Sequence, residues 1–121
     1  MTAEEALVAR LKSTPGVTAL VGTRIFPMEA PQGAVTPWIV YQRVSTNTFS
    51  VLRGRSSLDD PRLQYTVWAD TYSSARAVAT QVRLSLDDYQ VDGVHARFRD
   101  QRDVPNPDGI RKGVSQDYYV N

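Results

Sequence analysis

The feature that most constrains this fold is a stripe of apolar residues at helical spacing, set between segments that alternate apolar and polar residues. The stripe consists of Ala75, Val78, Ala79, Val82 and Leu86. This i, i+3, i+4, i+7 and i+11 pattern gives one apolar face to a helix that ends near residue 86, while Arg76, Gln81 and Arg83 face away. Thr71 or Ser73 is the expected N-cap.

Alternating segments predict the strands. Residues 38–45 place Trp38, Val40, Gln42 and Val44 on one face and Ile39, Tyr41 and Arg43 on the other. Residues 62–70 alternate in the same way, with Leu63, Tyr65, Val67 and Ala69 opposite Gln64, Thr66 and Trp68. Further strands are predicted over 94–99 and over about 111–120, the latter with Val114, Tyr118 and Val120 inward.

The N-terminal part predicts helix and loop. Thr2 and Glu5 fit a capping box for a short amphipathic helix over 3–13. Thr14 fits the cap of a second, single-turn helix that begins at Pro15 and ends at Gly22. A short strand over 24–26 and a proline-rich loop over 27–37 follow.

Together these elements predict one α+β domain over residues 1–121. Its sheet is mostly antiparallel, has four to five strands and is packed on one face by two helices. A chain of 121 residues is about the size of one domain. The connection from Thr46 to Pro61 is longer than a strand–strand connection normally is, which predicts a functional or disordered loop.

The residue types needed for most catalytic chemistry are missing. The chain has no cysteine and one histidine, His95, and no glycine-rich phosphate loop. The carboxylate pairs Asp59-Asp60 and Asp87-Asp88 are interpreted as solvated turn residues, because adjacent carboxylates diverge. We therefore expect no catalytic residue, no cofactor site and no metal site.

The charges favour protein contacts over nucleic acid. Fourteen basic residues face thirteen acidic ones, and twelve of the basic residues are arginines. Arginine is enriched at interface centres, although a genome rich in G and C produces the same bias. Arg97, Arg99 and Arg102 lie among aspartates near the last predicted hairpin, which favours an ion-pair network at a subunit contact over a phosphate-binding stripe.

The long connection carries the other interface candidates. Phe49, Val51 and Leu52 lie beside Arg53 and Arg55 in an otherwise polar segment. Three large apolar residues in such a segment favour contact with a partner protein. The alternative is that they extend the two flanking strands and pack on their own sheet.

Six segments resemble one protein family. They are 20–27 (Leu20-Val21-Gly22-Thr23-Arg24-Ile25-Phe26-Pro27), 30–33, 36–43 (Thr36-Pro37-Trp38-Ile39-Val40-Tyr41-Gln42-Arg43), 64–72, 75–83 and 114–120. In this order and spacing the chain resembles the tail completion proteins of long-tailed bacteriophages and related prophages. The connection from Thr46 to Pro61 is the part that the resemblance covers least.

The resemblance implies a tail terminator, a small subunit that forms a ring, usually of six copies, at the head-proximal end of the tail tube. Such a ring stops tube polymerisation and offers a surface to the head connector. The implied partners are further copies of the chain, the major tail tube protein and the head completion protein, with DNA only passing through the ring and no membrane. We expect assembly in the host cytoplasm, since the acidic N-terminus is unlike a signal peptide. The expected final location is the tail or neck of the virion. The alternative is another neck or minor tail component, such as a head–tail joining protein.

Overall fold

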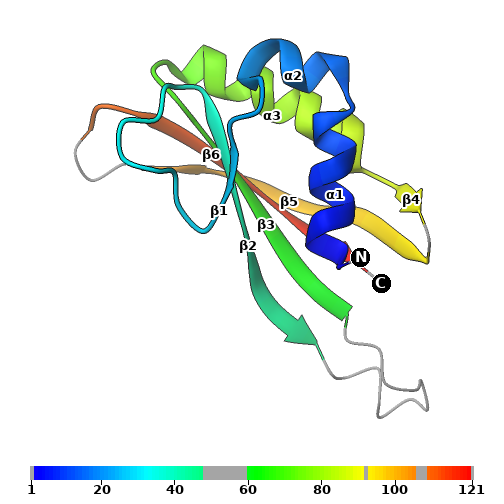
Figure 1. The fold of residues 1–121 in the computed structure, drawn as a ribbon. Helices are drawn as coiled ribbons and strands as arrows, with labels where there is room; N and C mark the ends of the chain where they lie inside the picture. The colour runs from blue at the N-terminus through cyan, green and yellow to red at the C-terminus, as the bar shows by residue number, and fades with distance from the viewer. Residues whose placement is uncertain (1, 48–59, 92, 106–108, 121) are drawn as a thin grey trace.

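A computed structural model describes residues 2–47, 60–91, 93–105 and 109–120. Three helices cover one face of a six-stranded sheet (Figure 1). The elements are α1 (Ala3–Lys12), α2 (Pro15–Val21), β1 (Ile25–Pro27), β2 (Trp38–Asn47), β3 (Asp60–Ala69), α3 (Tyr72–Leu86), β4 (Tyr89–Val91), β5 (Val94–Val104) and β6 (Lys112–Val120).

The strand order in the sheet is β1-β2-β3-β6-β5-β4. All neighbours are antiparallel except β1 and β2, which are parallel. The α+β class and the mostly antiparallel sheet are as predicted, but the predicted count of four to five strands and two helices is too low. The short strand predicted over 24–26 is confirmed as β1. The missed strand is β4, whose three residues are too few to display a period of two, and α2 is a third member of the helix layer.

The β2–β3 hairpin extends further than the sequence predicted. Its pairing continues from Trp38 opposite Trp68 to Asn47 opposite Asp60. The ends of the predicted long connection, residues 46–47 and 60–61, therefore belong to the strands. Residues 48–59, which carry Phe49, Val51, Leu52, Arg53 and Arg55, lie outside the described residues.

The helix ends follow the predicted caps, with one exception. Thr2 and Glu5 form the capping box of α1, and the Thr71 hydroxyl accepts a hydrogen bond from the Ser74 N–H at the start of α3. Thr14 precedes α2, but its side chain makes no cap because its hydroxyl donates to the Arg10 carbonyl instead. Pro15 at the first position still favours the helix start.

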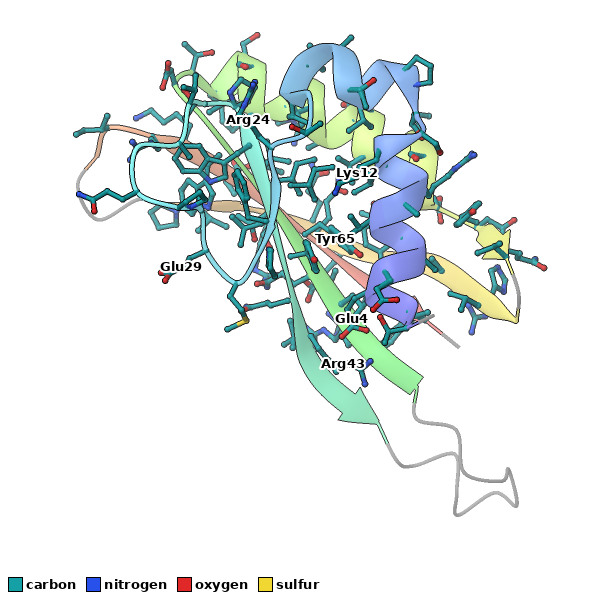
Figure 2. All side chains as sticks on the ribbon, in the orientation of Figure 1. Glu4, Lys12, Arg24, Glu29, Arg43 and Tyr65 are labelled. Carbon is teal, nitrogen blue, oxygen red and sulfur yellow. The ribbon has the colours of Figure 1, made fainter. Side chains whose placement is uncertain are left out.

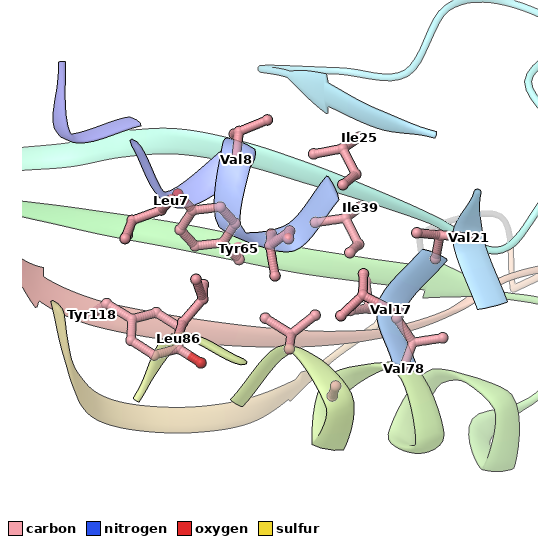
Figure 3. Close-up of a cluster of buried hydrophobic side chains, with 14 of the residues drawn as sticks. Leu7, Val8, Val17, Val21, Ile25, Ile39, Tyr65, Val78, Leu86 and Tyr118 are labelled. Carbon is pink, nitrogen blue, oxygen red and sulfur yellow. The ribbon is translucent and has the colours of Figure 1, made fainter. Parts of the chain in front are cut away.

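The core lies between the helices and the facing side of the sheet (Figure 3). The apolar stripe of α3 and the predicted inward residues of β3 are buried, as expected. Tyr118 contacts both Tyr65 and Phe98 edge to face, with ring centroids 6.0 and 5.7 Å apart. Burial raises the pKa of Tyr65 and Tyr118, so both phenols stay protonated.

One core residue is polar and was missed by the sequence prediction. Gln116 lies inward on β6 between the predicted Val114 and Tyr118. Its amide donates to the Ala79 carbonyl and to the Gln101 Oε1, at 2.8 and 2.7 Å, and its own Oε1 accepts from the Tyr118 hydroxyl at 2.7 Å. These bonds join α3, β5 and β6 through one buried side chain, whose polar atoms are all satisfied.

An ion pair fixes the first helix to the sheet. Arg43 of β2 and Glu4 of α1 lie against each other (Figure 2), with Arg43 Nη2 2.8 Å from Glu4 Oε1. The hydrogen bond from Arg43 is the main cause of a lowered pKa for Glu4.

Candidate interface on the helix-free face of the sheet

The second face of the sheet carries no helix, and we call it the helix-free face (Figure 1). It presents Trp38, Val40 and Gln42 from β2, Arg62, Gln64, Thr66 and Trp68 from β3, Ser115, Asp117 and Tyr119 from β6, and Arg97, Arg102 and Val104 from β5. The alternation of β3, and of β2 as far as Arg43, was predicted correctly, because every second residue belongs to the same face. The bulge between Arg43 and Ser45 takes Val44 out of the predicted pattern. Tryptophan and arginine are enriched at interface centres, so their presence on this face favours a role in protein contact.

A buried carboxylate organises the middle of this face. Asp117 of β6 is completely buried, and Arg62 of β3 donates from Nε to its Oδ2 at 2.9 Å. Arg102 of β5 lies on its other side, with Nη1 3.4 Å from Oδ1. A carboxylate that has lost its water needs such partners, because an unpaired buried charge costs several kcal/mol.

The bulge in β5 adds a second carboxylate to this cluster. Asp100 lies opposite Asp117 in the register, a placement that is unfavourable for two like charges. Arg99 Nη1 is 2.8 Å from Asp100 Oδ2, and Arg102 Nη1 lies 3.7 Å from Oδ1. Arg99 also donates from Nε to the Tyr119 hydroxyl at 2.9 Å, and this hydrogen bond is the main cause of its raised pKa. Arg102 thus lies between the two carboxylates, whereas Arg99 pairs with Asp100, whose buried Oδ1 has no hydrogen bond.

The structure brings two of the three predicted β5 arginines into one network. Arg99 and Arg102 are paired within the chain, so the mixed charges of this hairpin have intramolecular partners. Arg97 lies opposite Tyr119 and is exposed, and the described part of the chain provides no carboxylate for it. The remaining interface candidates, in 48–59, lie outside the described residues.

A hollow of about 450 Å³ lies beside this network, at the end of the sheet where β2 begins. Trp38, Val40 and Trp68 form its apolar part, and Arg102 and Arg111 form its charged rim. The loop between β1 and β2 closes one side through Met28, Glu29 and Ala30. The sequence prediction did not identify this site, because it depends on a loop whose path the alternation does not specify. The sequence did contain one indication of the site: the alternation places two tryptophans on the same face as two glutamines and a threonine, on the side away from the predicted core.

Trp38, which lines the hollow, has one buried polar atom without a partner. The side chain is only 8% exposed, and its indole Nε1 is buried without an acceptor. The Arg111 guanidinium lies 4.9 Å from the centroid of its ring, a cation–π contact. A buried donor without an acceptor costs about 1–3 kcal/mol.

Met28 on the rim has an unusual backbone conformation. Its φ is +67°, a region that favours glycine and asparagine, and its side chain is 68% exposed. Its N–H donates to the Tyr41 carbonyl at 2.9 Å, which holds the loop beside β2. A long apolar side chain at such a position costs about 1–2 kcal/mol and contributes little to the core of its own chain.

The other acidic residues singled out in the sequence have local partners. Asp87 accepts the Phe98 N–H at 3.1 Å, and Asp88 contacts His95 Nε2 at 2.5 Å. Asp103 accepts from the Tyr72 hydroxyl at 3.0 Å. Among the described residues, no three side chains of the metal-ligating types form a group. No helix within the described ranges is long and apolar enough to cross a bilayer.

Comparisons with known proteins agree with this fold. The family model described as "Tail completion protein gp17" matches residues 5–120. A chain in the solved structure "Virion of native gene transfer agent (GTA) particle" is similar, with a TM-score of 0.75, 15% sequence identity, and coverage of 94% of this chain and 89% of that chain. The comparison with curated proteins gives no match. Since the family model spans nearly the whole sequence, the family resemblance is confirmed: the chain belongs to the tail completion protein gp17 family of phage tail structural proteins.

Proposed function

We propose that this protein is a tail terminator, which forms a ring of six copies at the head-proximal end of a phage tail tube. The ring stops polymerisation of the tube and offers a surface to the head completion protein. The family match over residues 5–120 carries this proposal. The protein acts by binding, without catalysis or a cofactor.

The helix-free face supports a role in assembly. A two-layer domain buries one face of its sheet under helices and leaves the other to solvent or to a partner. Here that other face carries Trp38, Trp68 and Arg111 around a hollow, together with exposed Met28. A ring built from one kind of subunit needs two different complementary surfaces on each copy.

The proposed partners are further copies of the chain, the major tail tube protein and the head completion protein. DNA passes through the ring, and no membrane is involved. Assembly takes place in the host cytoplasm, and the mature protein resides in the tail or neck of the virion. Phe49, Val51, Leu52, Arg53 and Arg55, with Arg97, Arg99 and Arg102, remain the candidates for these contacts.

Particles made without this protein test the proposal. We expect tails that exceed the normal length, because nothing stops the tube, and restoration of normal length by the wild-type chain. Electron microscopy measures the length distribution. Tails of normal length beside unattached heads would contradict the terminator role and support a head–tail joining protein instead.

A further inference from the structure

The edge strand β4 leaves most of its neighbour β5 uncovered. It pairs only with Val94, His95 and Ala96, at the start of β5 (Figure 1). Beyond Ala96, the outer side of β5 pairs with no strand in the described part of the chain. An open strand edge presents backbone N–H and C=O groups, to which an extended segment of another protein can add as a further strand.

The backbone groups on this open edge can be assigned from Phe98. Its N–H points to the β4 side of the strand, because it donates to the Asp87 Oδ1 at 3.1 Å. In a strand, residues whose side chains lie on one face point their backbone groups to one side. Gln101 and Asp103 share the helix face with Phe98, since they lie opposite inward residues of β6, so their N–H and C=O groups also point outward.

A hollow of about 460 Å³ lies between this edge and α3. Its lining comes from Arg76, Thr80, Arg83 and Leu84 of α3, from Asp87 directly after the helix, and from Gln101 of β5. We call this hollow the α3–β5 groove. It lies outside the helix-free face, on the side of the sheet that the helices cover.

Two arginines give the groove positive charge. The Arg83 guanidinium lies 3.9 Å from the centroid of the Phe98 ring, and the Arg76 guanidinium lies 5.9 Å from the centroid of the Tyr72 ring. Such contacts restrict a guanidinium while its N–H groups stay available to an acceptor. Within the described ranges, neither arginine has a carboxylate within ion-pair distance.

The other lining residues favour an acidic and partly apolar occupant. The Gln101 Oε1 accepts from the Gln116 amide at 2.7 Å, so the Gln101 Nε2 is left as a donor. Asp87 is the one acid among the described lining residues, and it already accepts the Phe98 N–H. Leu84 is 71% exposed and adds an apolar surface. Carboxylates that alternate with apolar side chains match this lining.

We propose that the α3–β5 groove binds an extended acidic segment of a partner protein, which adds to β5 as a further strand and places carboxylates against Arg76 and Arg83. A peptide backbone supplies both donors and acceptors to the open edge, whereas a nucleic acid backbone supplies only acceptors. The two arginines are about 10 Å apart along the helix axis. Alternate residues of a strand are about 7 Å apart, so acids at every second position reach both arginines. The inference goes beyond the proposed ring, because it assigns a partner to a different surface.

Peptide binding to the purified wild-type chain tests this proposal. The probe is a fluorescent peptide of about eight residues that alternates glutamate and valine, a length that covers the open part of β5. Fluorescence anisotropy compares it with the same peptide in which glutamine replaces each glutamate. We expect the glutamate peptide to bind about tenfold more tightly. Equal affinity for the two peptides would overturn the proposal.

Single variants locate the binding to the groove. Arg76→Gln and Arg83→Gln should each weaken binding of the glutamate peptide about tenfold and leave the affinity for the glutamine peptide unchanged. Both arginines are exposed, so neither change opens the core. Lys12→Gln is the matched control, because it removes one exposed positive charge outside the groove. Groove variants that bind the glutamate peptide as tightly as Lys12→Gln would contradict the assignment.

Strand addition has its own readout. Hydrogen exchange of the Gln101 and Asp103 amides, followed by NMR, should slow when the glutamate peptide saturates the chain. Unchanged exchange at both amides would reject the added strand. A single-stranded DNA oligonucleotide that displaces the peptide at equal concentration would assign the arginines to nucleic acid instead, and so would overturn the proposal.

Failure of the proposed ring gives a different result. Sedimentation of the wild-type chain, with and without the glutamate peptide, reports the oligomer separately from peptide binding. A chain that binds the peptide but sediments as a monomer keeps the groove and contradicts the ring. A peptide that dissociates the oligomer would overturn the partner assignment, because the groove would then be a contact between copies.

Discussion

For the Arg62–Asp117 ion pair on the helix-free face, we predict that removal of the arginine costs more stability than removal of the aspartate. Asp117 is completely buried, whereas the Arg62 side chain is 28% exposed. Removing Arg62 leaves a carboxylate without its main partner and without water. Removing Asp117 leaves a guanidinium that still reaches solvent. The two substitutions therefore differ in cost although they break the same pair.

The structure sets the size of this difference. Loss of one partner from a buried pair costs about 3–5 kcal/mol. Arg62→Met should fall at the lower end, about 3 kcal/mol, because Arg102 remains 3.4 Å from the carboxylate. Asp117→Leu should cost about 1 kcal/mol, and the double variant should be no less stable than Arg62→Met alone, because replacing both partners by apolar residues is often neutral.

Denaturant unfolding followed by the fluorescence of the two tryptophans measures these values. The measurement is repeated at two protein concentrations, so that any contribution from assembly is separated from the stability of the subunit. A loss for Asp117→Leu equal to or larger than that for Arg62→Met would refute the reasoning. Additive losses in the double variant would refute it as well, because they would show that the pair is not coupled.

Four further predictions concern other parts of the chain. Leu86→Ala should lower the free energy of unfolding by about 2–5 kcal/mol, because the side chain is fully buried. Val82→Asp should abolish soluble expression, because it places a charge in the same core, and a normally folded Val82→Asp protein would contradict the packing of α3. The lowered pKa of Glu4 means that its ion pair adds stability above pH 4.5, and this stability is lost as the pH falls through the pKa of the folded state. In an acid titration, the free energy of unfolding of Glu4→Gln should therefore fall less steeply with pH than that of the wild type. Replacement of residues 49–55 by a Gly/Ser linker of equal length should leave the melting temperature unchanged while ring formation or tail termination fails; a much lower melting temperature would favour self-packing. Met28→Gly should leave the subunit at least as stable, because the relieved strain offsets the entropy cost of glycine, yet weaken oligomerisation in sedimentation.

Short-range patterns predicted most of the fold. Leu63, Tyr65 and Val67 face the helices as their period of two requires, and α3 begins after Thr71 as its cap requires. These features depend on neighbours within a few residues. The strand β4 has three residues, which is too short to display such a pattern, so the sequence reasoning missed it and underestimated the sheet.

Long-range contacts account for what was missed. Gln116 occupies an inward position because its partners Gln101 and Ala79 lie 15 and 37 residues away in the chain. Asp117 occupies an outward position by alternation and is nevertheless buried, because Arg62 and Arg102 lie against it. No local pattern encodes either arrangement. The candidate hollow depends in the same way on the β1–β2 loop.

Each face of the sheet has a buried side-chain donor that lacks a hydrogen-bond partner. On the helix side, the amide and carbonyl of Gln116 are fully bonded, whereas the hydroxyl of Tyr65 is buried without a hydrogen-bond partner. On the helix-free face and at the end of α3, strain, an unsatisfied donor and carboxylates at an unfavourable helix end persist. Each of these features costs of order 1 kcal/mol in the subunit. In the proposed ring, we expect a partner contact at the helix-free face, because the loop with exposed Met28 borders a hollow on the face that no helix covers.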